Sequence, residues 1–279
     1  MRGLSINEEW FHKLVLTHIL RAGHMNFKEK KVIVTGGTRG IGYAISSAFA
    51  QRGAQVAMVF RADRNKAEQA LTEIRAINSE YEHLIVQADL SDPEATASTF
   101  DLCVSALGGL DIVVNNAGIG INHPVDSVGY ADWQNIWQKT LACNLLGPAN
   151  LCFCASQHMI VEGGGRIVNV ASRGAYRGEP EKPAYGASKA GLISLGQSLA
   201  VSLAPYKIFV GTVAPGFVET DLSADLMASE KGAGVRAQSP LGRIAQPGEV
   251  AHAVLFLASE GAEFSTGTVI DVNGASYLR

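Results

Sequence analysis

The sequence contains little of what marks several classes of protein. Its 279 residues include only four cysteines, and their spacing fits neither a zinc site nor a disulfide framework. No uninterrupted apolar stretch is long enough to span a membrane. The net charge is −3 and no basic run stands out, so the charge offers nothing to attract nucleic acid. We therefore expect no metal site, no nucleic-acid partner and no membrane span, and we expect a cytoplasmic protein with reduced thiols.

The composition is that of a folded protein with a sizeable core. Hydrophobic residues make up 47% of the chain and charged residues 18%, which excludes a disordered chain. Cys152 and Cys154 lie in an apolar stretch that suits a helix. We expect both to be buried, structural thiols.

Residues 1–24 precede a second methionine, Met25. Charged residues and histidines interrupt any apolar core that a signal peptide would need; they are Glu8, Glu9, His12, Lys13 and His18. Two origins remain open, a short amphipathic helix or a cloning junction at 23–25 with Met25 as the natural start. We favour the second, and we expect an N-terminal extension over 1–24 and one folded domain over 25–279.

From position 30 onward, short β-branched runs alternate with longer segments that suit helices. The expected strands are 31–35, 55–60, 83–87, 111–115, 166–170, 208–213 and 268–272. The expected helices are 40–52, 64–78, 92–107, 131–161, 184–204 and 247–259. Apolar strands that alternate with helices predict a parallel sheet with helices on both faces. The pattern therefore predicts a single-domain α/β fold, a doubly wound sheet of the Rossmann type, which binds ligands beyond the carboxyl ends of its strands.

A glycine-rich turn follows the first strand, with the sequence Thr35-Gly36-Gly37-Thr38-Arg39-Gly40-Ile41-Gly42. Glycines at 36, 40 and 42 allow the backbone to approach a pyrophosphate, and the amides at the start of the next helix would face it. A plain tight turn would look similar. The position between a strand and a helix favours dinucleotide binding.

The second strand ends at Phe60 and is followed by Arg61, with Asp63 further on. An acidic residue at the end of this strand would bind the adenosine ribose and repel a 2′-phosphate. Arg39 in the glycine turn and Arg61 instead suit a phosphate, which favours NADP(H) over NAD(H). Two solvated surface arginines remain the alternative.

Tyr185 and Lys189 are four residues apart, so they lie on one face of the expected helix. A nearby ammonium would lower the pKa of the phenol, which could then give a proton to a carbonyl oxygen or take one from an alcohol. Ser172 follows the fifth strand, and its hydroxyl could polarise the same substrate oxygen.

These motifs resemble those of the short-chain dehydrogenase/reductase family, in its compact single-domain branch, over about 30–273. The resemblance implies a catalytic set of Asn144, Ser172, Tyr185 and Lys189, in which Asn144 holds a water against the lysine. It also implies a cofactor site formed by Gly36, Thr38, Arg39, Gly40, Ile41, Gly42, Arg61, Asp89, Leu90, Asn116, Ala117, Gly118, Tyr185, Lys189, Pro215, Gly216, Val218 and Thr220.

The resemblance assigns roles within that site. Asp89 would contact the adenine, although it could instead cap the following helix, as Ser91 and Asp92 also could. Val218 and Thr220 would bind the carboxamide, or Thr220 a phosphate. Segment 221–240, with its small residues, would form a mobile lid over the substrate.

The loop 173–183 would form another wall of the substrate site, and Arg173 could recognise an anionic substrate or form an outward salt bridge. The elements at the end of the chain, 240–275, usually build a homotetramer, or a dimer, through isologous interfaces.

The resemblance leaves the substrate open. One activity it implies is 3-oxoacyl-[acyl-carrier-protein] reduction, but the two places where arginines would contact the carrier protein hold Gln157 and Val201. The residues before Tyr185 also depart from that pattern, because 181–184 reads EKPA. We therefore favour a small-molecule carbonyl or secondary alcohol as substrate. A catalytically silent dinucleotide sensor, and an isomerase or dehydratase with a retained cofactor, remain alternatives.

Overall fold

The computed structural model describes residues 25–279, apart from the side chain of Leu222. The expected extension, 1–24, lies outside the described residues. Within them, seven parallel strands form one sheet in the order β3-β2-β1-β4-β5-β6-β7. The strands are β1 (Lys31–Thr35), β2 (Gln55–Phe60), β3 (Leu84–Gln87), β4 (Ile112–Asn115), β5 (Gly165–Val170), β6 (Ile208–Pro215) and β7 (Val269–Val272). All seven strands were predicted from the sequence, with boundaries that agree to within two residues.

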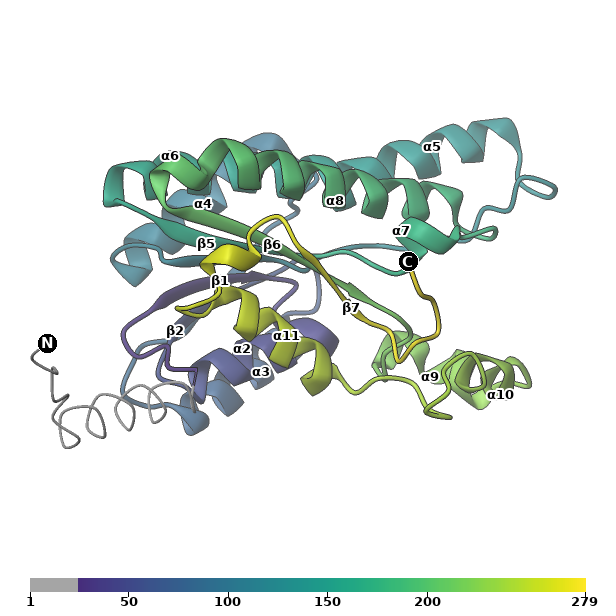
Figure 1. Ribbon diagram of the computed structural model, residues 1–279, viewed down its shortest axis with the longest axis horizontal. Helices are drawn as coiled ribbons and strands as arrows, with labels where there is room; N and C mark the ends of the chain where they lie inside the picture. The colour runs from purple at the N-terminus through teal and green to yellow at the C-terminus, as the bar shows by residue number, and fades with distance from the viewer. Residues whose placement is uncertain (1–24) are drawn as a thin grey trace, which may run out of the picture.

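The strand order reverses next to β1. The chain runs outward from β1 through β2 to β3 and then returns to place β4 on the other side of β1. The predicted doubly wound α/β fold is therefore confirmed (Figure 1). The carboxyl ends of β1 and β4 form the switch point, outside which such sheets bind their ligands.

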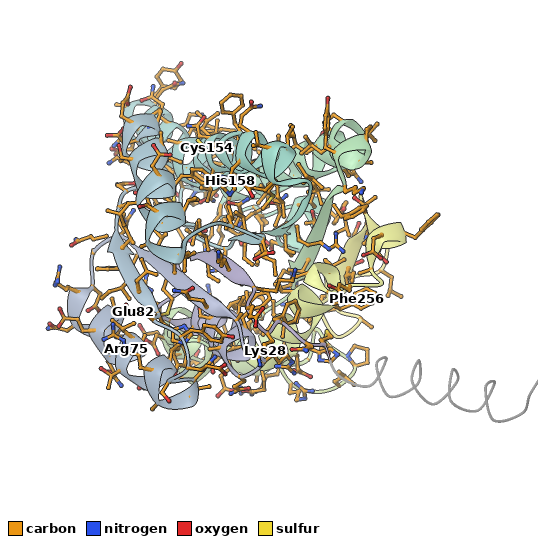
Figure 2. The ribbon with its side chains drawn as sticks, turned by 90° about the vertical axis from the view of Figure 1, so that its left-hand side faces the viewer. Lys28, Arg75, Glu82, Cys154, His158 and Phe256 are labelled. Carbon is orange, nitrogen blue, oxygen red and sulfur yellow. The ribbon has the colours of Figure 1, made fainter. Side chains whose placement is uncertain are left out.

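Helices cover both faces of the sheet, as Figures 1 and 2 show. One face carries α2 (Gly40–Ala50), α3 (Arg64–Ile77) and α11 (Pro247–Ala258), and the other carries α4 (Pro93–Leu107), α5 (Tyr130–Leu141), α6 (Gly147–Glu162) and α8 (Pro183–Leu203). Among residues 25–279, no helix has both the length and the apolar character that crossing a membrane requires.

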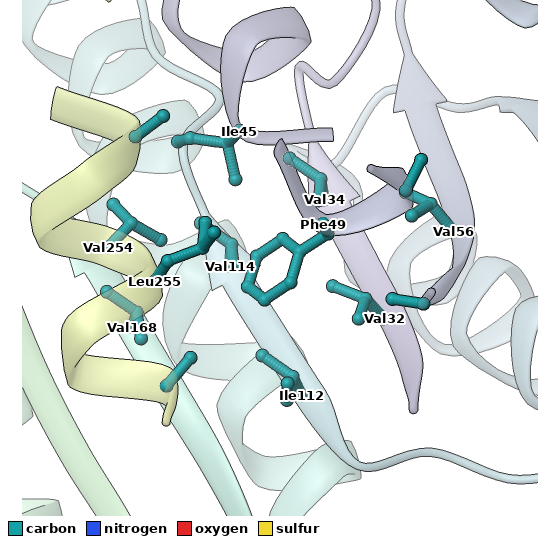
Figure 3. Close-up of a cluster of buried hydrophobic side chains, with 14 of the residues drawn as sticks. Val32, Val34, Ile45, Phe49, Val56, Ile112, Val114, Val168, Val254 and Leu255 are labelled. Carbon is teal, nitrogen blue, oxygen red and sulfur yellow. The ribbon is translucent and has the colours of Figure 1, made fainter. Parts of the chain in front are cut away.

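Each helical layer packs on the sheet through its own apolar core. On the first face, Phe49 of α2 and Leu255 of α11 are fully buried against Val32 and Val34 of β1 (Figure 3). A buried aromatic or aliphatic side chain of this size stabilises the fold by about 1.5–3 kcal/mol.

The single helix predicted over 131–161 is wrong. The chain instead forms α5, a π-helical turn over Ala142–Leu146, and then α6. Pro148 lacks the amide needed to continue the hydrogen-bond ladder, and Asn144 points its side chain into the protein from the wide turn. π-turns of this kind are frequent at functional sites.

Among residues 25–279, three short α-helices lie beyond the predicted set, besides a 3-10 turn over Glu263–Ser265. They are α7 (Gly174–Arg177), which follows β5, and α9 (Asp221–Ala228) and α10 (Lys231–Arg236), which make up the expected lid segment. All three lack the long apolar period that reveals a helix in a sequence.

The prediction for the cysteines is half right. Cys152 is buried, but Cys154 is only partly buried. The residues of α6 that face the protein are Leu151, Cys152, Ala155, Ser156 and Met159, and position 154 lies off that stripe.

His83 makes the fold sensitive to acid. It is fully buried, and its Nδ1 accepts a hydrogen bond from the amide of Val56 at 3.2 Å, so the ring proton is on Nε2, 2.9 Å from the carbonyl of Asn78. A second ring proton would face the Val56 amide. Burial lowers the pKa of His83 from its ordinary value of 6.5.

We expect this histidine to destabilise the fold as the pH falls. Between the lowered pKa and 6.5 the unfolded chain binds a proton that the folded chain does not. The contribution of neutral His83 to the free energy of unfolding is therefore complete above pH 6.5. It is lost as the pH falls from 6.5 toward the lowered pKa, by up to about 1.4 kcal/mol per pH unit. Urea unfolding of the wild type and His83→Gln between about pH 5 and 8 measures this. Parallel pH curves for the two proteins would contradict the prediction.

Candidate active site

The glycine turn between β1 and α2 has the backbone that a bound phosphate group requires. Gly36 and Gly40 have φ angles of +61° and +52°, in the left-handed region that favours glycine. Helix α2 begins at Gly40, and the side chain of Arg39 does not cap it. The first amides of α2 are therefore available to an anion.

Residues at the end of β4 hold this turn in place. The Asn116 side chain donates to the carbonyls of Thr35 at 2.9 Å and of Gly36 at 3.2 Å. The Thr35 hydroxyl accepts from the amides of Asn116 at 2.9 Å and Ala117 at 3.0 Å. The two strand ends at the switch point are thus joined, and the predicted cofactor residues of both strands meet there.

The loop after β6 closes against the same turn. The Thr220 methyl lies 3.2 Å from the position that a Cβ on Gly40 would take. Thr220 caps α9 together with Ser223, and Val218 is buried and pairs with Ala245. The structure therefore brings Thr220 beside the turn, where it could contact a phosphate.

The two arginines that favoured NADP(H) are both exposed, and within residues 25–279 neither forms an ion pair. Asp63, the nearest acidic residue after β2, instead caps α3 by accepting from the amide of Lys66 at 3.0 Å. Its carboxylate is thereby occupied at the helix end. Arg39 and Arg61 stay the two basic residues that the sequence predicts for the ribose end of the cofactor.

Asp89 does not cap α4. That role belongs to Asp92, which accepts from the amides of Glu94 and Ala95. The Asp89 carboxylate accepts from the amide and the hydroxyl of Ser91, and these bonds, with a smaller effect of Arg61, lower its pKa. The adenine-contacting role implied by the resemblance stays a prediction, while the capping alternative is wrong.

Helix α8 brings Tyr185 and Lys189 to the carboxyl edge of the sheet. Lys189 is almost fully buried, and its ammonium donates to the carbonyl of Val170 at the end of β5, at 2.8 Å. Burial lowers the pKa of Lys189 to about 8. The Nζ atom lies 5.8 Å from the centre of the Tyr185 ring.

The direction predicted for the pKa of Tyr185 is wrong in this structure. Burial raises the pKa of the phenol above its ordinary value of 10, a hydrogen bond with Ser172 lowers it by less, and the charge of Glu179 raises it further. The sequence pattern shows the ammonium but not the loss of solvent around the phenol. A phenol with a raised pKa stays protonated at neutral pH, which suits proton donation to a carbonyl oxygen.

Asn144, in the π-helical turn, connects the loop after β4 to α8. Its side chain forms two hydrogen bonds of 2.8 Å with the backbone of Ile119, and it donates to the hydroxyl of Ser188 at 3.1 Å. A Cβ on Gly118 would lie 3.3 Å from the Asn144 oxygen and 3.4 Å from the Lys189 nitrogen. The predicted catalytic residues therefore converge on the loop after β4. The water that the resemblance places between them stays a prediction.

His123 belongs to the site but was not predicted from the sequence. This histidine is buried, its Nδ1 bonds to the carbonyl of Ile121 at 2.8 Å, and its Nε2 accepts from the amide of Ala184 at 3.2 Å. Its ring packs edge-on against Trp133. Because Ala184 precedes Tyr185, His123 fixes the start of the catalytic helix. A single histidine in a loop carries no signal of this contact.

Known proteins resemble this chain in both sequence and fold. A family model described as enoyl-(acyl carrier protein) reductase matches residues 36–275. The 3-oxoacyl-[acyl-carrier-protein] reductase FabG of Escherichia coli (strain K12) is 35% identical over 254 residues, which are 91% of this chain and 100% of that protein. The cis-4-hydroxycyclohexanecarboxylate dehydrogenase of Sinomonas cyclohexanicum is 36% identical over 250 residues, 89% of this chain and 96% of that protein. Among solved structures, a short-chain type dehydrogenase/reductase from Mycobacterium ulcerans matches with a TM-score of 0.85 and 30% identity, over 91% of this chain and 92% of that one.

Proposed function

Because this chain belongs to the short-chain dehydrogenase/reductase family, we propose that it is an NADP(H)-dependent oxidoreductase that interconverts a carbonyl compound and a secondary alcohol. One observation carries the proposal. Tyr185, Ser172 and Lys189 lie together at the sheet edge that also holds the uncapped start of α2.

The residues present fit a dinucleotide. The turn offers backbone amides that no side chain caps, and Thr220 and Asn116 lie around it. When bound, NADPH would supply the hydride, so that a C–H bond breaks on the nicotinamide and another forms on the carbonyl carbon, while the oxygen gains a proton.

The chain's own side chains would handle that proton. Tyr185 donates it from its hydroxyl to the substrate oxygen, and the Ser172 hydroxyl hydrogen-bonds to the same oxygen and polarises it. Lys189, held by the Val170 carbonyl, places a positive charge beside the phenol and stabilises the phenolate that forms. In the oxidation of an alcohol the same groups act in reverse. Spectrophotometric screening of NADPH consumption across carbonyl compounds tests this activity.

We expect NADPH to bind at least about tenfold more tightly than NADH, because a charge-assisted hydrogen bond from an arginine to a phosphate is worth roughly 1.5–3 kcal/mol. Arg39→Ala combined with Arg61→Ala should remove most of this difference and leave NADH binding nearly as it was. Fluorescence titration of the purified protein measures both affinities.

Arg64→Ala is the matched control, because Arg64 is exposed at the start of α3 but already bound to Glu68. It should retain the preference for NADPH. Tighter binding of NADH by the wild type would show that both arginines point away from the ribose.

A second candidate function is 3-oxoacyl-[acyl-carrier-protein] reduction, the activity after which several relatives are named. In reductases of carrier-bound substrates, the resemblance implies an arginine at position 201 that contacts the carrier protein. Position 201 on α8 is 81% exposed, so it is open to a partner, but it holds a valine. A reductase of carrier-bound substrates should strongly prefer them to the same acyl group on a small thioester. Equal rates would favour the small-molecule reaction.

The assembly and location are also proposals. Several large apolar side chains lie exposed on α6 and α8, namely Leu146 just before α6, Phe153, Val161 and Val201. Contact with a second copy would remove them from water, in line with a homotetramer or dimer. We propose that residues 25–279 act as one domain, and that the protein, whose four cysteines are all unpaired, works in the cytoplasm.

A further inference from the structure

Arg173 directly follows Ser172, yet it is not the outward surface arginine that was one alternative. Only 4% of it is exposed. Its guanidinium packs over the Phe217 ring, 5.0 Å from the ring centre, and donates to the Ser276 hydroxyl and, at 2.6 Å, to the side-chain oxygen of Gln238. The sequence neighbour of the catalytic serine is therefore a buried cation.

Both side-chain partners of this cation are neutral. Within residues 25–279 no carboxylate lies within 4.0 Å of Arg173, and the nearby Glu179 packs against Gly174 instead. A buried charge without a counter-ion is costly, and most proteins pair it. Burial, and to a smaller extent the neighbouring Arg177, lower the pKa of Arg173, and the more distant Glu179 only partly offsets them.

A second arginine shares the same neutral oxygen. Arg177, one turn further along α7, donates to Gln238 Oε1 at 2.9 Å. Two guanidinium groups thus converge on one amide oxygen. A carboxylate in that place would neutralise both and accept their hydrogen bonds more strongly than an amide does.

There is open space beside Arg173. A cavity of about 250 Å³ is lined by Arg173, Phe217 and Val235 among others, and it includes Ser239, the residue after Gln238. Its other charged groups already have partners, because Arg243 binds Glu249 with two bonds and Asp271 binds Arg279. Among the charged groups that line this cavity in the described chain, Arg173 is thus the one that forms no ion pair.

The position of Gln238 also fits displacement. Its side chain is exposed, and it follows α10 in the expected lid segment. The chain end lies close to α7 as well, where Arg279 stacks on Tyr176 (Figure 1). A ligand that took the place of Gln238 would therefore contact the lid and the residue next to Ser172 together.

We propose that Arg173 and Arg177 bind the carboxylate of the substrate in place of Gln238, so that the enzyme acts on oxo acids and hydroxy acids. This inference rests on the proposed oxidoreductase function and adds the substrate class. The carboxylate remains unchanged in the reaction, and the reduced group is the ketone elsewhere in the same molecule.

Matched pairs of acid and amide test the proposal, since the two differ in charge and hardly in shape. The probes are 4-oxopentanoate, 5-oxohexanoate and 4-oxocyclohexanecarboxylate, each with its primary amide. We expect kcat/KM with NADPH to favour the acid by at least about tenfold for one pair or more, the value of a charge-assisted contact. Equal values for acid and amide in all reactive pairs would overturn the proposal.

Three variants test whether Arg173, Arg177 and Gln238 determine the acid-to-amide ratio, which is kcat/KM for an acid divided by kcat/KM for its amide. Arg173→Met and Arg177→Gln should each lower it. Gln238→Glu ties a carboxylate to both arginines, so it should raise the melting temperature and also lower the ratio, mainly through KM for the acid. A purely structural Arg173 would give the higher melting temperature with an unchanged ratio, which contradicts the proposal. Gln238→Glu keeps the test valid even if Arg173→Met fails to fold.

Arg52→Gln is the charge-matched control, because Arg52 follows α2 at the opposite edge of the sheet and binds the Ala48 carbonyl. It should keep the wild-type ratio.

A binding measurement without turnover completes the test. Each acid should raise the melting temperature of the wild type but not of Arg177→Gln, and the amides should raise neither. Absence of any cofactor binding would instead refute the proposed function itself.

Discussion

Tyr185→Phe is expected to lower kcat for carbonyl reduction by roughly 10²- to 10⁴-fold, the usual value of a positioned general acid. The substitution removes one oxygen from a side chain beside Ser172 and leaves its ring in place. Because burial keeps the phenol protonated at neutral pH, this oxygen is the proton donor of the proposed reduction. NADPH affinity should stay within about threefold of wild type, since the ring and Lys189 remain. Steady-state kinetics and fluorescence titration measure the two effects.

Tyr206→Phe provides the matched control. Tyr206 lies just beyond the carboxyl end of α8, is 49% exposed, and undergoes the same loss of one hydroxyl. Its variant should turn over at the wild-type rate. A Tyr185→Phe enzyme as active as this control would remove Tyr185 from the mechanism. Loss of cofactor binding together with activity would show that the Tyr185 hydroxyl is needed to hold the cofactor, and that the lower kcat does not measure proton transfer.

Gly42→Ala is expected to disrupt the turn on which the cofactor proposal rests. A Cβ at Gly42 would lie 2.7 Å from the carbonyl carbon of Gly36, closer still to its oxygen, and 2.6 Å from Asn116 Nδ2. The Gly36 carbonyl is backbone, in a left-handed residue, and cannot rotate away. We expect a loss of about 1–3 kcal/mol of stability. Displacing one amide from a phosphate costs a further tenfold or more in NADPH affinity.

Gly248→Ala is the control, because it makes the same glycine-to-alanine change at a place where the new methyl group causes no clash. Gly248 lies in the first turn of α11, and a Cβ there would meet nothing within 4 Å. The variant should be as stable as the wild type or more stable by up to about 1 kcal/mol, because alanine restricts the unfolded chain. Thermal unfolding and NADPH titration of both variants make the comparison. Equal stability of the two variants would mean that a Cβ at Gly42 is tolerated. Equal NADPH affinity would mean that the turn does not approach the cofactor.

Several parts of this architecture could be predicted without coordinates. The seven strands lie within two residues of their expected bounds because each is a short apolar run bounded by polar residues. The glycine turn and the Tyr185–Lys189 pair were equally accessible, since each depends on residues close together in the sequence. The break at Ala142–Leu146 was not, because a π-turn leaves the apolar pattern of the flanking helices almost unchanged.

The sequence by itself determined the order of strands and helices, and with it the sheet edge at which the candidate site forms, because backbone periodicity and turn chemistry are local properties. Only the tertiary structure decided the environment of each functional group. It placed the amide of Ala184 on His123, partly buried Tyr185 and so raised its pKa, and buried Arg173 among neutral partners. These effects arise between residues as far apart in the chain as Arg173 and Ser276. Burial and charge depend on such long-range contacts, which no local pattern contains.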